Sequence, residues 1–239
     1  MESNQIKQML REQYPWRIEL HAHTNPVSSC SEFVPEELVR TYWDRGFHGM
    51  VLTNHMALGR LSDSKDRTLK MYMEDYERAQ KAGEKLGFSV YLGVELCFKG
   101  SANDYLVYGL DEDLLGTCYD YLDKGVAAFR AEVDLKNSVF LQAHPFRNGM
   151  TLCQPELLDG IECLNLHPNH NSRVALATRY GYEQDFPIKI AGSDCHHPGQ
   201  EALTALRTRA MPGDSFEVAR ILKQGDYIFD IGDGSLWLP

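Results

Sequence analysis

The sequence lacks the features that mark several specialised classes of protein. Its six cysteines are scattered and form no Cys-x-x-Cys pair, so we expect reduced thiols rather than a disulfide framework. No apolar run approaches the ~18 residues that a membrane span needs. The opening segment MESNQIKQMLREQYPW also has no apolar core of the kind found in signal peptides. We therefore expect a soluble, cytoplasmic protein without a membrane partner.

Basic residues are also in short supply. The chain has 24 lysines and arginines against 34 aspartates and glutamates, which gives a formal net charge of −10. An acidic surface repels phosphate backbones, so a nucleic-acid polymer is not an expected partner unless a basic or metal-filled cleft overrides the mean charge. Nothing in the pattern of residues indicates an oligomeric state.

No internal repeat and no stretch rich in proline, glycine or serine divides the chain. Its 239 residues, 43% of them hydrophobic, are enough to bury a large core and are a normal length for one α/β barrel. We predict a single domain over residues 1–239, in which residues 1–15 form an N-terminal extension.

Short apolar segments alternate with longer helical patterns along the whole chain. The predicted strands cover residues 17–20, 49–53, 89–94, 105–108, 138–142, 160–165, 188–191 and 227–231. The predicted helices cover residues 35–44, 69–86, 113–135, 172–180 and 215–224. Alternation of this kind predicts parallel βαβ units and an α/β fold.

Five of the predicted strands end in residues that can bind a metal ion. These residues are His21 and His23, His55, Glu95, His144, and Asp194 with His196. In a parallel barrel the carboxyl ends of the strands form one face, and the active site is built there. Neutral imidazole is the commonest nitrogen ligand for zinc, iron or manganese, and carboxylates complete such sites. The pattern therefore predicts a shared metal site.

The blocks LHAHT, LTNH, LGVE, QAHP and AGSDCH occur in this order from about residue 17 to the C-terminus. In this order and spacing they resemble the polymerase and histidinol phosphatase (PHP) family. The resemblance implies a distorted (β/α)7 barrel that is similar to a TIM barrel. It also implies a cluster of two or three divalent metal ions (zinc, manganese or iron) and the hydrolysis of phosphate esters.

Carried over residue by residue, the resemblance implies a role for each metal-binding side chain. His21 and His23 would hold one metal together with Asp194, and Glu95 would bridge that metal to a second one. His144 would join Glu95 on the second metal.

The resemblance also implies a third metal, which His55 and His196 would hold on the phosphate side. The TDH block of the family is TNH in this chain, so Asn54 stands beside the expected ligand His55 and not in its place.

Two further departures from the family pattern concern the ligands themselves. Cys30 stands where many members have an aspartate or histidine, and it is either a thiolate ligand or an ordinary loop cysteine. Glu32 is the other candidate nearby. Asp104 stands where the family often has a histidine. It is either a ligand that favours a harder ion such as manganese or iron, or part of a turn with Asn103.

Several other polar residues have more than one interpretation. Arg147 is either a bidentate phosphate contact or a surface arginine. His167 and His170 either support the metal ligands and contact the substrate, or belong to a polar loop.

Expected roles can also be given for the remaining polar residues. His197 either faces away from the metals or joins Arg147 in holding phosphate oxygens, and we expect His48 to be structural at the opposite end of the barrel. Glu162 and Asn165 could orient the ligating histidines, which usually donate their second N–H to an oxygen.

The sequence thus predicts a phosphatase that acts on a small-molecule phosphate monoester with a metal-activated hydroxide. Asp194 or His196 would assist proton transfer and Arg147 would hold the phosphate. Two alternatives remain open. One is a metal-dependent amidohydrolase, and the other is a non-catalytic PHP-type domain that binds metal. No spacing identifies the leaving group of the substrate.

Overall fold

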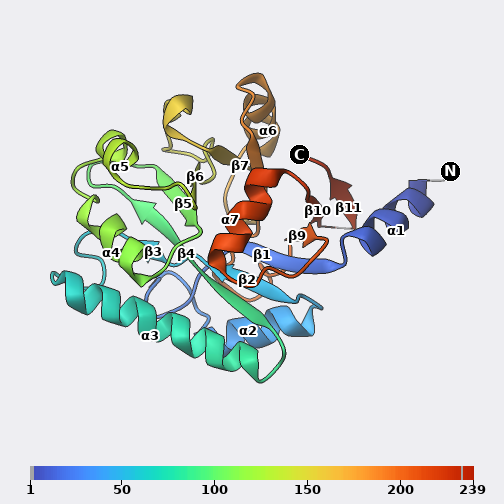
Figure 1. Ribbon diagram of the computed structural model, residues 1–239, viewed down its shortest axis with the longest axis horizontal. Coiled ribbons are helices and arrows are strands. Elements are labelled where there is room, and N and C mark those ends of the chain that lie inside the picture. Colours follow the sequence, from blue (N-terminus) through green and yellow to red (C-terminus); the bar gives the residue numbers. More distant parts are fainter. Residues whose placement is uncertain (1–2, 233) are drawn as a thin grey trace.

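The computed structural model describes residues 3–232 and 234–239 (Figure 1). The strands lie at β1 Trp16–Ala22, β2 Gly49–Leu52, β3 His55–Met56, β4 Ser89–Cys97, β5 Asp104–Tyr108, β6 Val139–Gln142, β7 Gly160–Asn165, β8 Ile188–Gly192, β9 Thr204–Thr208, β10 Ile228–Ile231 and β11 Ser235–Trp237. The helices lie at α1 Ser3–Gln13, α2 Pro35–Asp44, α3 Lys65–Glu84, α4 Glu112–Asp120, α5 Val126–Glu132, α6 Val174–Glu183 and α7 Ser215–Gln224, with a 3-10 turn η1 at Pro155–Leu157. The predicted α/β fold is confirmed.

The strands form one mixed sheet in the order β11-β10-β9-β1-β2-β4-β5-β6-β7-β8, and β3 pairs with β4. The pairs β1–β2, β2–β4, β6–β7 and β7–β8 are parallel. The prediction of parallel units is wrong for β5, which is antiparallel to both β4 and β6, and for β10, which is antiparallel to both β9 and β11. Only residues 98–103 connect β4 to β5, and a parallel crossover needs about a dozen residues or more.

The sheet curls so that its β8 edge comes back towards β1. An isolated parallel bridge joins Ala22 to Cys195, just beyond the end of β8. The backbone N–H of His23 donates to the carbonyl of Cys195 at 3.0 Å, and the N–H of Cys195 donates to the carbonyl of His21 at 3.3 Å. The result is a half-barrel in which the ends of β1 and β8 meet. The finer (β/α)7 description remains a prediction.

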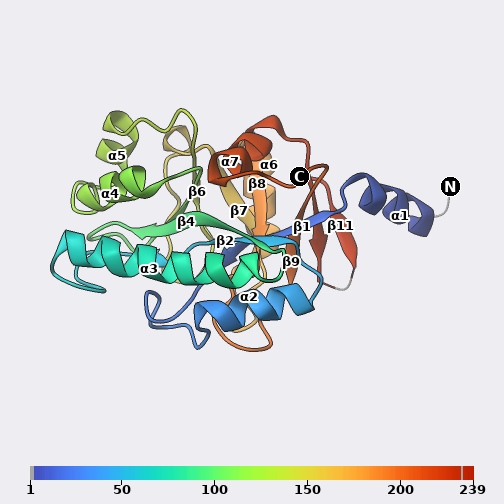
Figure 2. The same cartoon turned by 60° about the horizontal axis from the view of Figure 1, so that its bottom comes forward.

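Helices α2 and α3 pack against each other along one side of the sheet, and the other helices except α1 lie on its far side or at its ends (Figures 1 and 2). Helix α1, which falls in the predicted N-terminal extension, stands away from the sheet. The single helix predicted over 113–135 is two helices, α4 and α5. The chain turns between them at Gly125, whose φ of +85° suits glycine. Among the described residues, no helix is long and apolar enough to cross a membrane.

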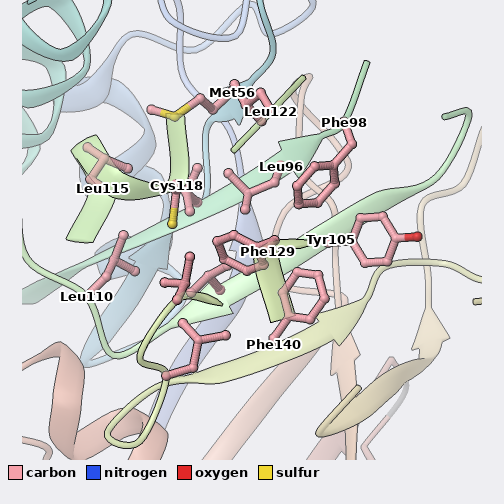
Figure 3. Packing of buried hydrophobic residues seen from close by; sticks show 14 of the residues in the cluster. Met56, Leu96, Phe98, Tyr105, Leu110, Leu115, Cys118, Leu122, Phe129 and Phe140 are labelled. Atoms are coloured by element: carbon pink, nitrogen blue, oxygen red, sulfur yellow. The ribbon is translucent and has the colours of Figure 1, made fainter. Parts of the chain in front are cut away.

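The largest hydrophobic cluster lies between the β4–β5–β6 part of the sheet and helices α4 and α5. Phe140 on β6 is fully buried there and contacts several aromatic rings (Figure 3). Its ring centroid lies 5.0 Å from that of Tyr105 and 5.1 Å from that of Phe129. This packing fixes β6, and β6 ends two residues before His144. The core therefore determines where one of the predicted ligands lies.

Replacing Phe140 with alanine should lower the free energy of unfolding by about 3–5 kcal/mol, because it removes buried area and leaves a cavity among close-packed rings. Urea denaturation of the metal-free protein measures this change. Met9→Ala on the exposed face of α1 is the control and should change stability by about 0.5 kcal/mol or less. Equal effects of the two substitutions would contradict this account of the core.

Candidate metal centre

The predicted metal-binding side chains converge at the carboxyl ends of the strands. They form three overlapping groups that could each hold a metal ion, and the ligand atoms of each group lie within 4.8 Å of one another. The groups are His21 with His23 and Asp194, His21 with Glu95 and His144, and His23 with His55 and His196. His55 is half-buried and the other six residues are buried. The convergence expected from the strand ends is therefore present.

The first group lies at the junction of β1 and β8. Asp194 Oδ1 is 3.4 Å from His21 Nε2 and 3.2 Å from His23 Nε2. The two histidines are at alternate positions, so their side chains leave the same face of the chain. Asp194 reaches them from a backbone φ of +53°, a conformation that few non-glycine residues adopt.

The second group is centred on Glu95, which β4 places opposite the end of β1. Glu95 Oε1 lies 3.3 Å from His21 Nε2 and 3.1 Å from His144 Nε2. Its other oxygen, Oε2, lies 2.7 Å from His55 Nδ1 and 3.5 Å from His23 Nε2. Glu95 therefore touches members of all three groups, as the bridging role implied by the family resemblance requires.

The third group lies nearest the surface. The ring of His23 stacks on those of His55 and His196, with ring centroids 4.3 Å and 4.2 Å apart. The Nε2 atoms of His55 and His196 face each other at 3.4 Å.

The second ring nitrogens show which atom of each histidine is free to bind a cation. His21 Nδ1 lies 2.8 Å from the Glu162 carboxylate, and His196 Nδ1 lies 2.9 Å from the backbone carbonyl of Asp194. An imidazole that donates from Nδ1 carries a lone pair on Nε2. His55 Nδ1 lies 2.7 Å from Glu95 Oε2, but within the described residues neither atom has a hydrogen-bond partner.

The Nε2 atoms of these histidines face other atoms that can accept a hydrogen bond. Nε2 of His21 faces only carboxylate oxygens, and Nε2 of His196 faces that of His55. Within the described part of the chain, His21 Nε2, His23 Nε2 and Glu95 Oε2 are buried without a hydrogen-bond partner. Buried acceptors that converge without a donor suit a cation. The donor set of imidazole and carboxylate fits zinc, manganese or iron.

The charges around the centre hold the pKa values of Glu95, Asp194 and His23 low, which favours the forms that bind metal. The same charges raise the pKa values of His21, His55 and His196, so without metal these imidazoles favour a proton. Burial raises the pKa of Glu95, but the imidazoles of His21 and His55 more than offset this and hold it well below its ordinary value. Burial and the neighbouring rings of His196 and His55 keep the pKa of His23 well below its ordinary value. Burial lowers the pKa of His21, but Glu162 and Asp194 raise it, so in the absence of metal a proton stabilises this residue.

Glu162 and Asn165, on β7, form hydrogen bonds that hold the predicted metal ligands in position. Glu162 Oε1 lies against His21 Nδ1, and Glu162 Oε2 accepts the backbone N–H of His144 at 2.9 Å. Asn165 Nδ2 donates to Glu162 Oε2 at 3.0 Å and to Asp194 Oδ2 at 3.2 Å. Gly192 leaves room for this network, since a Cβ there would lie 2.3 Å from Glu162 Oε1 and 2.6 Å from His21 Cβ.

Glu162→Gln should weaken metal binding by about 10- to 100-fold, the usual cost of losing a carboxylate that orients a ligating histidine. The amide keeps the shape of the side chain but sets an N–H group against either His21 or the backbone N–H of His144. Titration against a competing chelator measures the affinity. Glu156→Gln, an exposed glutamate in η1, should leave it unchanged. If both variants bind metal like the parent protein, Glu162 does not orient the ligands.

A second buried network was not predicted from the sequence. Asp75, on α3, is buried behind the metal centre and accepts hydrogen bonds from Thr24 Oγ1 and Asn54 Nδ2. Asn54 Oδ1 in turn accepts from the backbone N–H of Thr24 at 2.7 Å and from Ser28 Oγ at 2.8 Å. Asn54, the departure from the family block, thus ties the loop after β1 to a carboxylate on α3. Only the folded structure brings α3 to this place.

Burial raises the pKa of Asp75 from 3.8 to about 6. The unfolded chain therefore loses this proton at lower pH than the folded protein does, so the contribution of Asp75 to stability falls as pH rises from about 4 to about 6. The loss amounts to up to about 3 kcal/mol. Asp75→Asn removes it, so the variant should match the parent near pH 4 and exceed its stability near pH 7. Urea denaturation with chelator present measures both, and a constant difference across this range would contradict the assignment.

Arg147 is not a surface arginine. Its Nη2 contacts Asp194 Oδ2 and donates to Asn165 Oδ1 at 2.9 Å, and its side chain is 14% exposed. Within the described residues its buried Nε has no hydrogen-bond partner. Arg147 therefore holds the side of Asp194 that faces away from His21 and His23.

Cys30 and Asp104, the two predicted ligands that depart from the family pattern, lie beside the groups and not within them. Burial raises the pKa of Cys30, but hydrogen bonds with His196 and His55 outweigh this and lower it to about 5. Asp104 Oδ2 lies 3.9 Å from His144 Nε2, and burial and the charge of Glu95 raise its pKa. The ligand roles of both residues remain predictions.

The other candidate residues lie around the centre or far from it. His167 is buried with its ring centroid 5.7 Å from that of His196, and it lines a cavity of about 460 Å³ together with His170. His197 Nδ1 lies 3.2 Å from the Glu32 carboxylate, and both side chains are exposed. His48 accepts the backbone N–H of Arg17 at 3.1 Å, at the other end of β1.

A larger cavity of about 720 Å³ lies near the start of β4, between α3 and the start of α7. None of the residues that line it belongs to the three groups. Cavity size therefore does not mark the metal centre in this fold.

Solved structures with a similar fold include one that contains a predicted PHP-like metal-dependent phosphoesterase. A two-domain protein from Bacteroides vulgatus that contains a predicted PHP-like metal-dependent phosphoesterase aligns over 91% of this chain, with 16% identity and a TM-score of 0.60. The chain spans 65% of the length of that protein. PsfC from Pseudomonas syringae aligns over 80% of this chain and 81% of its own, with 16% identity and a TM-score of 0.57. At such identities the similarity shows a shared fold. No family model and no curated protein matches the sequence.

Proposed function

We propose that the protein is a metal-dependent phosphoesterase that hydrolyses a small-molecule phosphate monoester. The observation that carries this proposal is the buried convergence of imidazole nitrogens and carboxylate oxygens around Glu95, where His21 Nε2, His23 Nε2 and Glu95 Oε2 have no hydrogen-bond partner within the described residues. The fold that the chain shares with a PHP-like phosphoesterase supports the same reaction class.

Phosphate monoesters resist hydrolysis because their negative charge repels an anionic nucleophile. Divalent cations, when bound, neutralise the phosphoryl oxygens and lower the pKa of water from ~15.7 to near ~7. In this proposal His21, His23 and Asp194 hold one cation, and Glu95 and His144 hold a second. The carboxylate of Glu95 keeps the two cations at a fixed separation.

Arg147 and Asp194 act together in this proposal. Asp194 Oδ2 is held by Arg147 and Asn165, which leaves Oδ1 for the cation. The Arg147 side chain is 14% exposed, and its guanidinium can donate a further N–H to a phosphoryl oxygen. One guanidinium would then connect the substrate to a metal ligand.

Proton transfer to the leaving group is assigned to one of two residues, Asp194 or His196. Both oxygens of Asp194 are engaged, whereas His196 is nearer the surface, with 10% of its side chain exposed against 1% for Asp194. His196 could move a proton only while its Nε2 is not bound to a cation. The number of bound cations therefore decides which residue can act as the acid.

A small substrate suits the surroundings of the centre. The cavity of about 460 Å³ beside His167 and His170 begins at Asn165, which contacts both Glu162 and Asp194. This volume is in the range of pockets that bind small molecules. We propose that the leaving group of the ester occupies it.

His21→Ala, Glu95→Ala and Asp194→Ala should each lower phosphatase turnover by about 100-fold or more and reduce the amount of bound metal, because each removes a ligand. The assay is a panel of phosphate monoesters with manganese, iron or zinc. His48→Ala, at the far end of β1, is the matched control and should keep the parent activity.

Two outcomes would count against the proposal. Hydrolysis of an aryl phosphate by the three variants at the parent rate would show that the centre is not the site of reaction. Tight metal binding by the parent with turnover of cyclic amides and not of phosphate esters would favour an amidohydrolase, and binding without any turnover would favour a non-catalytic domain.

A further inference from the structure

Glu19, on β1, is a fully buried carboxylate that the proposed reaction does not use. The pairing of β1 with β2 is regular up to Glu19, and its register shifts between Glu19 and Ala22. Irregularities of this kind re-aim side chains next to active sites. At this place Glu19 Oε1 accepts the backbone N–H groups of Leu20 and His21, at 3.0 Å each. The carboxylate therefore holds the irregular stretch of β1 from which the His21 side chain leaves.

The same carboxylate holds the end of β8. Glu19 Oε1 also accepts the backbone N–H of Ser193 at 3.1 Å, and Glu19 Oε2 accepts the hydroxyl of Ser193 at 2.6 Å. Ser193 follows the last residue of β8 and directly precedes Asp194. Asp194 has a backbone φ of +53°, which a non-glycine residue keeps only where its surroundings fix the chain. One side chain thus fixes the backbone beside two predicted metal ligands on different strands.

The hydroxyl of Ser193 makes this contact specific for a carboxylate. Its oxygen already accepts the backbone N–H groups of Leu203 and Thr204, at 3.1 and 3.2 Å. Both of its lone pairs are then in use, so its proton must go to an acceptor. Glu19 Oε2 is that acceptor, and it also accepts the hydroxyl of Tyr42, on α2, at 2.9 Å. An amide nitrogen in place of Oε2 would face a hydroxyl that cannot accept its N–H, and in place of Oε1 it would face three backbone N–H groups.

We propose that Glu19 is a positioning residue of the metal centre. It belongs to none of the three groups, but it fixes the separation between His21 on β1 and Asp194 after β8, which share one cation position. This inference rests on the cation centre of the proposed function and not on hydrolysis. A role in stability alone would not connect the loss of Glu19 with the affinity or the geometry of the bound cation.

Glu19→Gln should weaken the binding of manganese by about 10- to 100-fold, the usual cost of losing a group that orients metal ligands. The amide keeps the volume of the side chain but cannot satisfy the hydroxyl of Ser193. Titration of the chelator-stripped protein with manganese against a competing chelator measures the affinity. In protein loaded with cobalt, the visible absorption of the ion should also change in position or intensity, because the ligands around it move.

Tyr42→Phe is the matched control, because it removes one hydrogen bond to the same carboxylate and leaves the contacts with β1 and Ser193 in place. It should lower the stability of the metal-free protein but keep the parent affinity for manganese and the parent cobalt spectrum. Ser193→Ala removes the contact from its other partner and should weaken manganese binding as Glu19→Gln does. The double variant should bind about as weakly as the weaker single variant, since both substitutions break one interaction.

Hydrogen exchange gives a readout without metal. In metal-free protein, Glu19→Gln should speed the exchange of the backbone amides of His23 and Cys195, which join the ends of β1 and β8, more than that of amides between β6 and β7. The inference is overturned if Glu19→Gln binds manganese like the parent, if Tyr42→Phe loses as much affinity, or if exchange of these two amides is unchanged. Loss of manganese affinity in a protein without phosphatase activity would support the inference and reject the proposed function.

Discussion

The centre of the molecule depends on one arrangement that is unfavourable by itself, namely buried lone pairs directed at one another. Glu95 Oε1 lies 3.3 Å from His21 Nε2, and among the described residues His21 Nε2, His23 Nε2 and Glu95 Oε2 have no hydrogen-bond partner. Each buried polar group left unsatisfied costs about 1–3 kcal/mol. The fold tolerates this cost because β1, β4 and β6 are fixed by a close-packed core, and positive charge relieves it.

Most of the centre could be predicted because its residues follow the ends of apolar segments. Residues at the carboxyl ends of parallel strands meet at one edge of the sheet. His21, His144 and Asp194 could therefore be predicted as ligands from the approximate ends of their strands, without exact boundaries. Glu95 was found in the same way, although β4 continues to Cys97, because its side chain faces the interior of the curled sheet. The α/β fold followed from the same alternation of segments.

What could not be predicted depends on contacts between distant parts of the chain. The hydrophobic pattern of β5 is the same in either direction, and only the short connection from β4 makes it antiparallel. Asp75 reads as a polar position on an amphipathic helix, and its burial against Asn54 arises from the way α3 packs. Arg147 was a candidate because it follows His144 by a few residues. Its contact with Asp194 could not be predicted, because this contact depends on the loop after β6 turning towards β8.

The ends of β1 and β8 meet at an isolated bridge between Ala22 and Cys195, so an ion bound beside it would also have a structural role. His21 and His23 lie on the β1 side of this bridge and Asp194 lies on the β8 side. A metal ion held by all three would therefore cross-link the two ends of the curled sheet. Folding and metal uptake would then be thermodynamically linked, since a ligand that binds only the native state adds its binding free energy to stability. Metal coordination would then hold β1 and β8 together at the place where few backbone hydrogen bonds join them.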